Sequence, residues 1–143
     1  MKTKFSELLK VKKQKVSEIE QKLAAKRHEK EVVVLQKLQI ESEIAAYTLP
    51  SQGDFSAMQL AISGRDYLFK EKEQKENIIK YFNQEINNLN ILYKEANIEY
   101  EKIKHLHEVE MQKIVEAIAK EESKQMDEIA NQLFMRNRNR DLS

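Results

Sequence analysis

"TLPSQGD", residues 48–54, holds the single proline of the chain and one of its two glycines. Pro50 disfavours a helical conformation at Leu49, and Gly53 permits a positive φ, so the chain is predicted to reverse here. Asp54 is a suitable N-cap for a helix that follows. Both flanks are rich in Lys and Glu and nearly free of residues that break helices. The stretch therefore predicts one turn between two long helices.

The composition agrees with long helices and excludes several other classes of protein. Charged residues make up 34% of the chain and aromatic residues 7%, and tryptophan is absent. A sequence of this kind is typical of coiled coils, which have a narrow apolar seam in place of a thick core. The net charge of +1 gives no overall attraction to nucleic acid or to a membrane. The absence of cysteine excludes disulfides and thiolate chemistry, and it suits a reducing compartment.

Upstream of the turn, apolar residues recur in alternating steps of four and three, which is the heptad pattern of a coiled coil. Lysines interrupt this seam, since their stems can pack while the ammonium groups stay hydrated. We expect one helix over about residues 3–48. Its predicted seam consists of Phe5, Leu9, Lys12, Val16, Ile19, Leu23, Lys26, Lys30, Val33, Lys37, Ile40, Ile44 and Tyr47.

Downstream of the turn, "SGRD" at residues 63–66 predicts a second break, because Gly64 interrupts the helix and Asp66 can cap a new one. We therefore expect the turn and a short helical piece over about residues 49–65, and a second long helix over about 66–137. Consecutive steps of four near His107 and Met111 indicate a stutter in its seam. That seam consists of Ile79, Phe82, Ile86, Leu89, Tyr93, Ala96, Tyr100, Ile103, His107, Met111, Val115 and Ile118, and it resumes at Met126, Ile129 and Leu133.

The predicted fold is all-α: two long helices in an antiparallel coiled-coil hairpin, with residues 1–143 forming a single domain. The second helix exceeds the first by roughly 40 Å at 1.5 Å per residue. Part of the apolar stripe of the second helix must therefore be covered by something other than the first helix. The residues 55–63, a second copy of the chain and a different protein are the three possibilities.

No residue pattern indicates catalysis, a metal or a cofactor, and we expect the protein not to be an enzyme. His105 and His107 are two residues apart and lack the i, i+4 spacing of a zinc-binding helix. The lysines near the N-terminus are spread around the helix without interleaved aromatic residues, which favours a solvated or protein-docking face over nucleic-acid binding. We see no signal peptide and no apolar run able to span a bilayer, so a cytoplasmic location without membrane insertion is expected.

Both ends of the chain resemble the flagellar export protein FliJ. The resemblance is carried by "MKTKFSELLKVKK" at residues 1–13 and by "KQMDEIANQLFMR" at residues 124–136, with its M-D-E-[IF]-A block and the following M-R. A single turn near residue 50 and the chain length fit the same family. The resemblance implies an antiparallel coiled coil similar to the rotor stalk of rotary ATPases.

The resemblance also implies partners and a location. Members of this family insert into the central hole of the hexameric flagellar export ATPase and promote the assembly of its ring. They contact the linker of the transmembrane export gate, and some bind export chaperones. By this resemblance the protein is cytoplasmic, peripheral to the inner membrane at the export apparatus, and monomeric when alone.

Two sets of residues are expected to carry these contacts. Met126, Ile129 and Leu133 are expected mostly to hold the rod together, while Asp127, Glu128 and the terminal arginines face outward. The expected gate contact lies on the first turns of the second long helix, at Tyr67, Leu68 and Ile78. The expected ATPase-binding residues are Phe5, Leu8, Leu9, Met126, Asp127, Glu128, Ile129, Leu133 and Arg136.

Three other functions remain open at this point. The equivalent stalk of a virulence secretion system shares the fold. A self-associating coiled-coil chaperone or scaffold would cover the exposed stripe with a second copy or with the apolar segments of its clients. A DNA or RNA binder comes last, because it lacks an ordered basic face.

Overall fold

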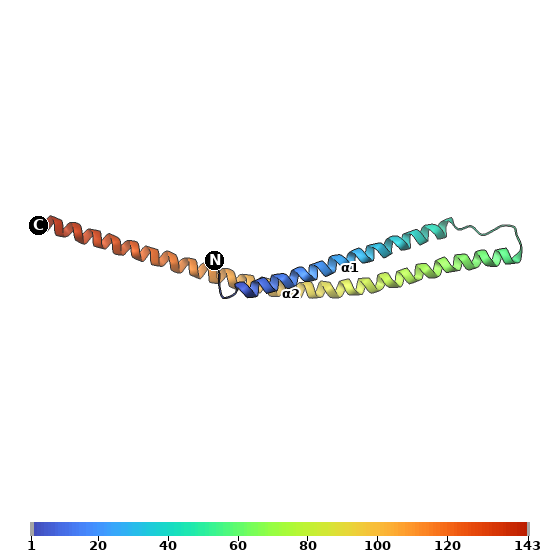
Figure 1. Ribbon diagram of the computed structural model, residues 1–143, viewed down its shortest axis with the longest axis horizontal. Coiled ribbons are helices and arrows are strands. Elements are labelled where there is room, and N and C mark those ends of the chain that lie inside the picture. The colour runs from blue at the N-terminus through green and yellow to red at the C-terminus, as the bar shows by residue number, and fades with distance from the viewer. Residues whose placement is uncertain (1, 143) are drawn as a thin grey trace. The chain divides into compact units, whose positions relative to one another are not determined.

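The computed structural model describes residues 2–142, which form two helices, α1 (Ser6–Ala46) and α2 (Phe55–Leu142) (Figure 1). The described residues contain no strand. The helices pack against each other as an antiparallel hairpin, and α2 is the longer. The predicted fold class is confirmed.

The seam predicted for α1 is confirmed by the burial of its side chains. Val16, Ile19, Leu23 and Ile40 are buried, and every other predicted seam position is half-buried, the lysines included. Most of the residues between them are exposed. Burying one such aliphatic side chain stabilises a fold by roughly 1.5–3 kcal/mol, so the few buried residues carry much of the hairpin's stability.

The start of α1 is fixed by a reciprocal pair of polar side chains. The Phe5 amide donates to Oγ1 of Thr3 at 3.1 Å, and the Thr3 amide donates to Oγ of Ser6 at 2.8 Å. The pair is similar to a capping box with Thr3 as the N-cap, but the Thr3 hydroxyl accepts from the second amide after it and the reciprocal side chain is a serine. It satisfies backbone donors that an uncapped helix would leave without partners.

The turn forms where the sequence predicts it. Gly53 has a φ of 149°, a conformation that side chains with a β-carbon rarely adopt. Asp54 caps α2, because its Oδ1 accepts a 2.7 Å hydrogen bond from the Ala57 amide. Both features follow directly from the residues between Thr48 and Asp54.

The predicted break at residues 63–66 is wrong, because α2 runs through Gly64 without interruption. The glycine serves a close contact instead. A β-carbon on Gly64 would collide with the hydroxyl of Tyr47, which donates a 2.8 Å hydrogen bond to the carbonyl oxygen of Ala61. The residues 55–63 are consequently the first turns of α2 itself, and α2 continues beyond residue 137 to Leu142.

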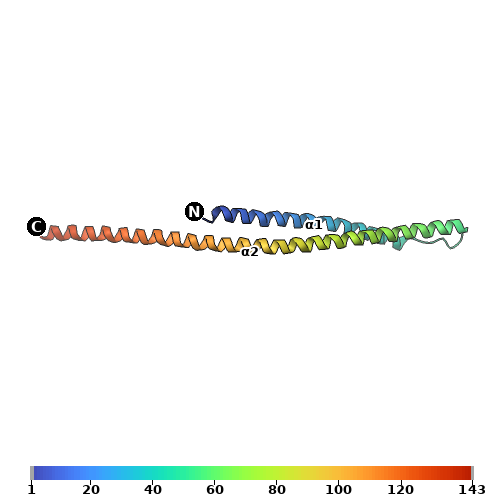
Figure 2. The same cartoon turned by 90° about the horizontal axis from the view of Figure 1, so that it is seen from below.

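Packing within the chain divides it into two units, Lys15–Asn97 and Met1–Gln14 with Ile98–Ser143. In Lys15–Asn97, α1 and α2 lie side by side in both views (Figure 1, Figure 2). Ion pairs join Lys26 to Glu85 and Lys37 to Glu76 there, at 3.1 and 3.6 Å. The residue numbers rise on α1 as they fall on α2, which is an antiparallel register. The single-domain organisation stays a prediction.

Candidate partner-binding surfaces

The end of α2 presents an uncovered helix. Ile114 is its last half-buried residue, and every residue from Val115 to Asp141 is exposed. We call residues 115–141 the C-terminal segment. It forms the orange-to-red end of α2 in Figure 2. Helices in proteins gain most of their stability from packing of an apolar face, so this uncovered segment is suited to a partner.

One face of the C-terminal segment is apolar. Its side chains recur at steps of three and four, which places them on one side of the helix. Glu122 interrupts this face between Ile118 and Met126. We call the apolar residues the C-terminal stripe: Val115, Ile118, Met126, Ile129 and Leu133, with exposed fractions of 50%, 48%, 68%, 52% and 53%.

The role predicted for three of these residues is wrong for the described chain. Met126, Ile129 and Leu133 were expected to hold the hairpin together, but they are exposed and lie beyond the last half-buried residue of α2. The piece at residues 55–63 does not cover them, because it is the start of the same helix. The sequence pattern therefore identified the stripe but assigned it the wrong partner.

The charges of the C-terminal segment are divided along its length. Residues 116–128 contain five carboxylates and two lysines, a net charge of −3, whereas residues 129–141 contain three arginines and one carboxylate, Asp141, a net charge of +2. Asp127, Glu128 and Arg136 are exposed. Arginines near the end of a helix also interact favourably with its macrodipole.

The N-terminal candidates lie apart from this segment. Phe5 and Leu9 are half-buried, and Leu8 is 41% exposed. Close by, Thr3 Oγ1 lies 2.8 Å from Nδ1 of His107. Met126 is about 28 Å further along α2 than His107. The structure thus does not bring the N-terminal candidates together with Met126–Arg136.

The gate candidates divide into one half-buried and two exposed residues. Leu68 is half-buried, whereas Tyr67 and Ile78 are 62% and 39% exposed. Tyr67 and Ile78 are three helical turns apart and so share a face of α2. Leu60, which is 76% exposed and lies two turns before Tyr67, extends this face. The sequence analysis missed Leu60, although its spacing of seven from Tyr67 indicates it.

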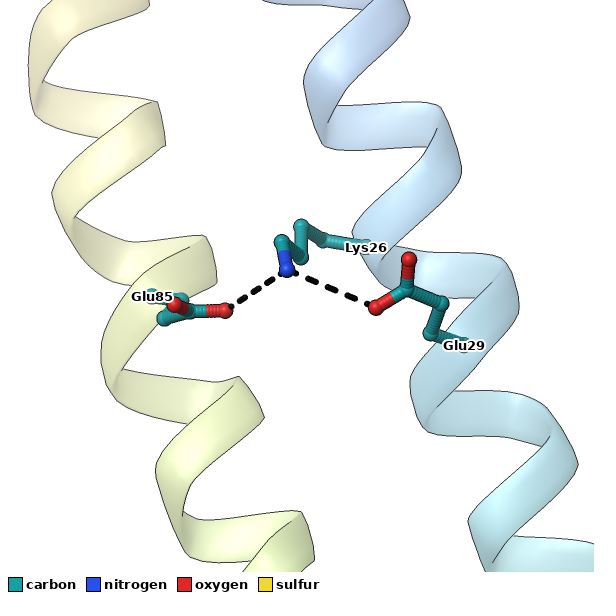
Figure 3. A network of polar contacts seen from close by, with 3 residues as sticks. All are labelled: Lys26, Glu29 and Glu85. Carbon is teal, nitrogen blue, oxygen red and sulfur yellow. Dashed lines mark hydrogen bonds and ion pairs between the residues drawn. The ribbon is translucent and has the colours of Figure 1, made fainter.

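A charged cluster sits in the seam of Lys15–Asn97. Lys26 Nζ lies 3.1 Å from Glu85 Oε2 on α2 and 3.4 Å from Glu29 Oε2 on its own helix (Figure 3). The ammonium also lies 5.7 Å from the centroid of the Phe82 ring. The cluster covers the ring and links the two helices at a seam position that an aliphatic residue usually takes.

The pKa values of Lys26, Glu85 and the neighbouring Tyr81 are shifted from their ordinary values. The Glu85 carboxylate raises the pKa of Lys26 and that of Tyr81 above their ordinary values. The Tyr81 hydroxyl, and then the Lys26 ammonium, lower the pKa of Glu85. Each shift favours the state in which Lys26 and Glu85 are charged and Tyr81 is neutral.

Two kinds of site are absent from residues 2–142. No group of three or more His, Cys, Asp or Glu side chains is placed to hold a metal ion. No helix in the same residues is long and apolar enough to cross a membrane.

A scan against protein families matches the flagellar FliJ protein family over residues 1–139. The chain belongs to the FliJ family. The match covers nearly the whole chain, including both termini and the turn. Searches of curated proteins and of solved structures each returned no match. As a member of the FliJ family, the chain is a component related to flagellar protein export.

Proposed function

We propose that the protein is a stalk of the flagellar export apparatus that binds the hexameric export ATPase and promotes the assembly and activity of its ring. It catalyses no reaction itself. The observation that carries the proposal is the exposed C-terminal stripe, together with membership of the FliJ family. A single uncovered amphipathic helix is slender enough to enter the centre of a ring and can pack against its inner wall.

The C-terminal stripe supplies the apolar part of this contact and the flanking charges supply its orientation. Met126, Ile129 and Leu133 pack on the ring, while Asp127, Glu128 and Arg136 pair with charges on its wall. Charged residues around an apolar centre set the rate and specificity of binding more than its strength.

The N-terminal candidates act at a second position along the same unit. Leu8 is exposed and contacts the ATPase, whereas Phe5 and Leu9 face α2 and hold the base of the C-terminal segment. Since Met126 lies about 28 Å from this base, the two contacts are made at different depths of the ring.

The face formed by Tyr67 and Ile78 is proposed to bind the linker of the export gate, with Leu68 supporting it from the seam. Two exposed apolar side chains on one helix face fit a peptide that docks along the helix. Export chaperones are further partners. These contacts place the protein on the cytoplasmic side of the inner membrane, at the export apparatus.

Mixing the chain with the cognate export ATPase tests the proposal. Ring formation is followed by electron microscopy and hydrolysis by phosphate release. Full-length protein is expected to raise both, and truncation after Ser123 is expected to abolish the effect. An Ile129→Asp variant reports on the stripe. Asn131→Asp is its matched control, because it adds the same charge about 200° around the helix. Equal loss of activity in both variants, or no effect of the intact chain, contradicts the proposal.

The equivalent stalk of a virulence secretion system has no observation in its favour here, because the family that matches is the flagellar one. The same mixing experiment separates the two. A virulence-type export ATPase is expected to respond less than the flagellar enzyme at equal protein concentration.

A further inference from the structure

The two halves of the C-terminal segment carry opposite net charges. Its first half, residues 116–128, has a net charge of −3, and its second half, residues 129–141, has a net charge of +2. The C-terminal stripe runs through both halves without a change of face. A partner that covers the whole stripe must therefore present positive charge to the first half and negative charge to the second.

We propose that a second copy of the chain is this partner, and that two C-terminal segments pair antiparallel, centred on Ile129. In this arrangement the acidic half of each segment faces the basic half of the other, so both charges are matched at once. A parallel pairing would place acid on acid and base on base, which costs free energy. The inference goes beyond the proposed function, because it concerns the chain before any ATPase is present.

The residues of the stripe fit this centre. Ile129 meets its own counterpart, and Met126 of each copy meets Leu133 of the other on either side. These apolar layers follow from an antiparallel register in which the residue numbers of opposed positions add to about 258. The exposed fractions of the three side chains, 68%, 52% and 53%, leave them free to form such layers.

Glu122 favours this register over other antiparallel registers of the two segments. It lies on the same face as the stripe, where a carboxylate facing only apolar groups would be costly. Centring the pair on Ile129 sets Glu122 opposite Arg136, which lies one heptad after Ile129 and so on the same face. Two such pairs form in the dimer, one on each side of the centre. A charged pair of this kind fixes the register of a coiled coil.

Other occupants fit the same segment less well. An anionic lipid surface would attract the basic half of the segment and repel the acidic half. An apolar peptide would leave Glu122 without a cation. This proposal differs from the expectation of a monomer: reversible pairing would keep the stripe covered until the ATPase displaces the second copy.

Single cysteines test the geometry cleanly, because the natural chain has none. A disulfide requires the two Cα atoms to lie within about 7 Å. In the antiparallel pair, Ile129→Cys meets its own counterpart and is expected to form a covalent dimer under mild oxidation. Ile118→Cys is the matched control: its two copies lie about 33 Å apart, so no dimer is expected. Cross-linking of both variants indicates a parallel pair and overturns the proposal.

Charge exchange tests the register. In light scattering of the full chain from about 1 to 100 µM, a dimer is expected to form as the concentration rises. Glu122→Arg and Arg136→Glu, each alone, are expected to weaken the dimer by about tenfold or more, and the double variant to restore it. These substitutions are expected to leave the hairpin folded, because Glu122 and Arg136 are exposed and lie beyond Ile114, the last half-buried residue of α2. A monomer at all concentrations, a dimer that survives truncation after Ser123, or a double variant as weak as the singles overturns the proposal.

Discussion

The hydroxyl of Tyr47 lies where a β-carbon on Gly64 would stand, and it donates a 2.8 Å hydrogen bond to the carbonyl oxygen of Ala61. The phenol thereby joins the first residue after α1 to the second turn of α2. Glycine inside a helix costs about 1 kcal/mol relative to alanine. That cost is offset by a hydrogen bond that a larger residue would prevent.

Replacing Gly64 by alanine is therefore expected to stabilise the chain in one background and to leave its stability nearly unchanged in another. In Tyr47→Phe the hydroxyl is gone, so Gly64→Ala should stabilise the chain by about 1 kcal/mol through helix propensity. In the natural chain the same change displaces the hydroxyl, and losing its hydrogen bond of about 1 kcal/mol cancels the gain. Urea unfolding followed by circular dichroism measures both differences. Equal stabilisation in the two backgrounds contradicts the close contact.

The contact between Tyr47 and Gly64, and with it the continuity of α2, could not be predicted from the sequence. A glycine followed by "RD" indicates a break, and propensity alone has no means of detecting a tyrosine seventeen residues upstream. Propensity is a weak guide wherever tertiary packing acts on the same residue. The local signals at the turn were sufficient, in contrast, because Gly53 and Asp54 act within their own turn.

The periodicity of the two helices predicted their seams but not the identity of what covers them. Val16, Ile19 and Leu23 are buried as expected, because a partner helix lies within the same chain. Ile129 and Leu133 have the same spacing and are exposed. A repeat of three and four specifies an apolar face, and only the lengths of the helices decide whether the chain itself can cover that face.

The ion pair between Lys26 and Glu85 predicts a stability that depends on pH in two directions. Glu85 has a lowered pKa, so its contribution is present above the ordinary value of 4.5 and is lost as the pH falls through the folded pKa. Lys26 has a raised pKa, so its contribution is present below 10.5 and is lost as the pH rises through the folded pKa. Tyr81 acts in the same direction as Lys26 at high pH, since its pKa is also raised.

The measurement is the difference in unfolding free energy between the natural chain and Glu85→Gln as the pH changes. The difference is expected to be greatest near neutral pH, to shrink at both extremes, and to fall with added salt, because the pair is partly exposed. Glu29→Gln is the matched control, since Glu29 contacts the same ammonium from within α1 and links no second helix. An equal effect of the two substitutions would contradict an interhelical role for Glu85.

The start of α1 should depend on the hydroxyl of Thr3. Thr3→Val keeps the shape of the side chain but removes the acceptor for the Phe5 amide and the contact with His107. Loss of an N-cap costs about 1 kcal/mol, so the Phe5 amide is expected to exchange its hydrogen roughly fivefold faster or more. Thr3→Ser retains the hydroxyl and should exchange nearly as the natural chain does. Amide exchange by NMR resolves the two, and equal exchange in both variants rules out the cap.

The C-terminal segment is expected to contribute almost nothing to the stability of the hairpin. Truncation after Ser123 removes only residues that lie beyond Ile114, the last half-buried residue of α2, so the thermal midpoint should change by less than about 2 °C. Ile103→Ala, at a seam position of α2, is the contrasting variant and should lower the midpoint by several degrees. The comparison is best made at low and high protein concentration, because pairing of the segments would stabilise only the intact chain, and only when concentrated. A large fall of the midpoint on truncation at both concentrations means that the segment folds back on its own hairpin. The stripe would then have an intramolecular partner, and neither the ring wall nor a second copy would be needed to explain its pattern.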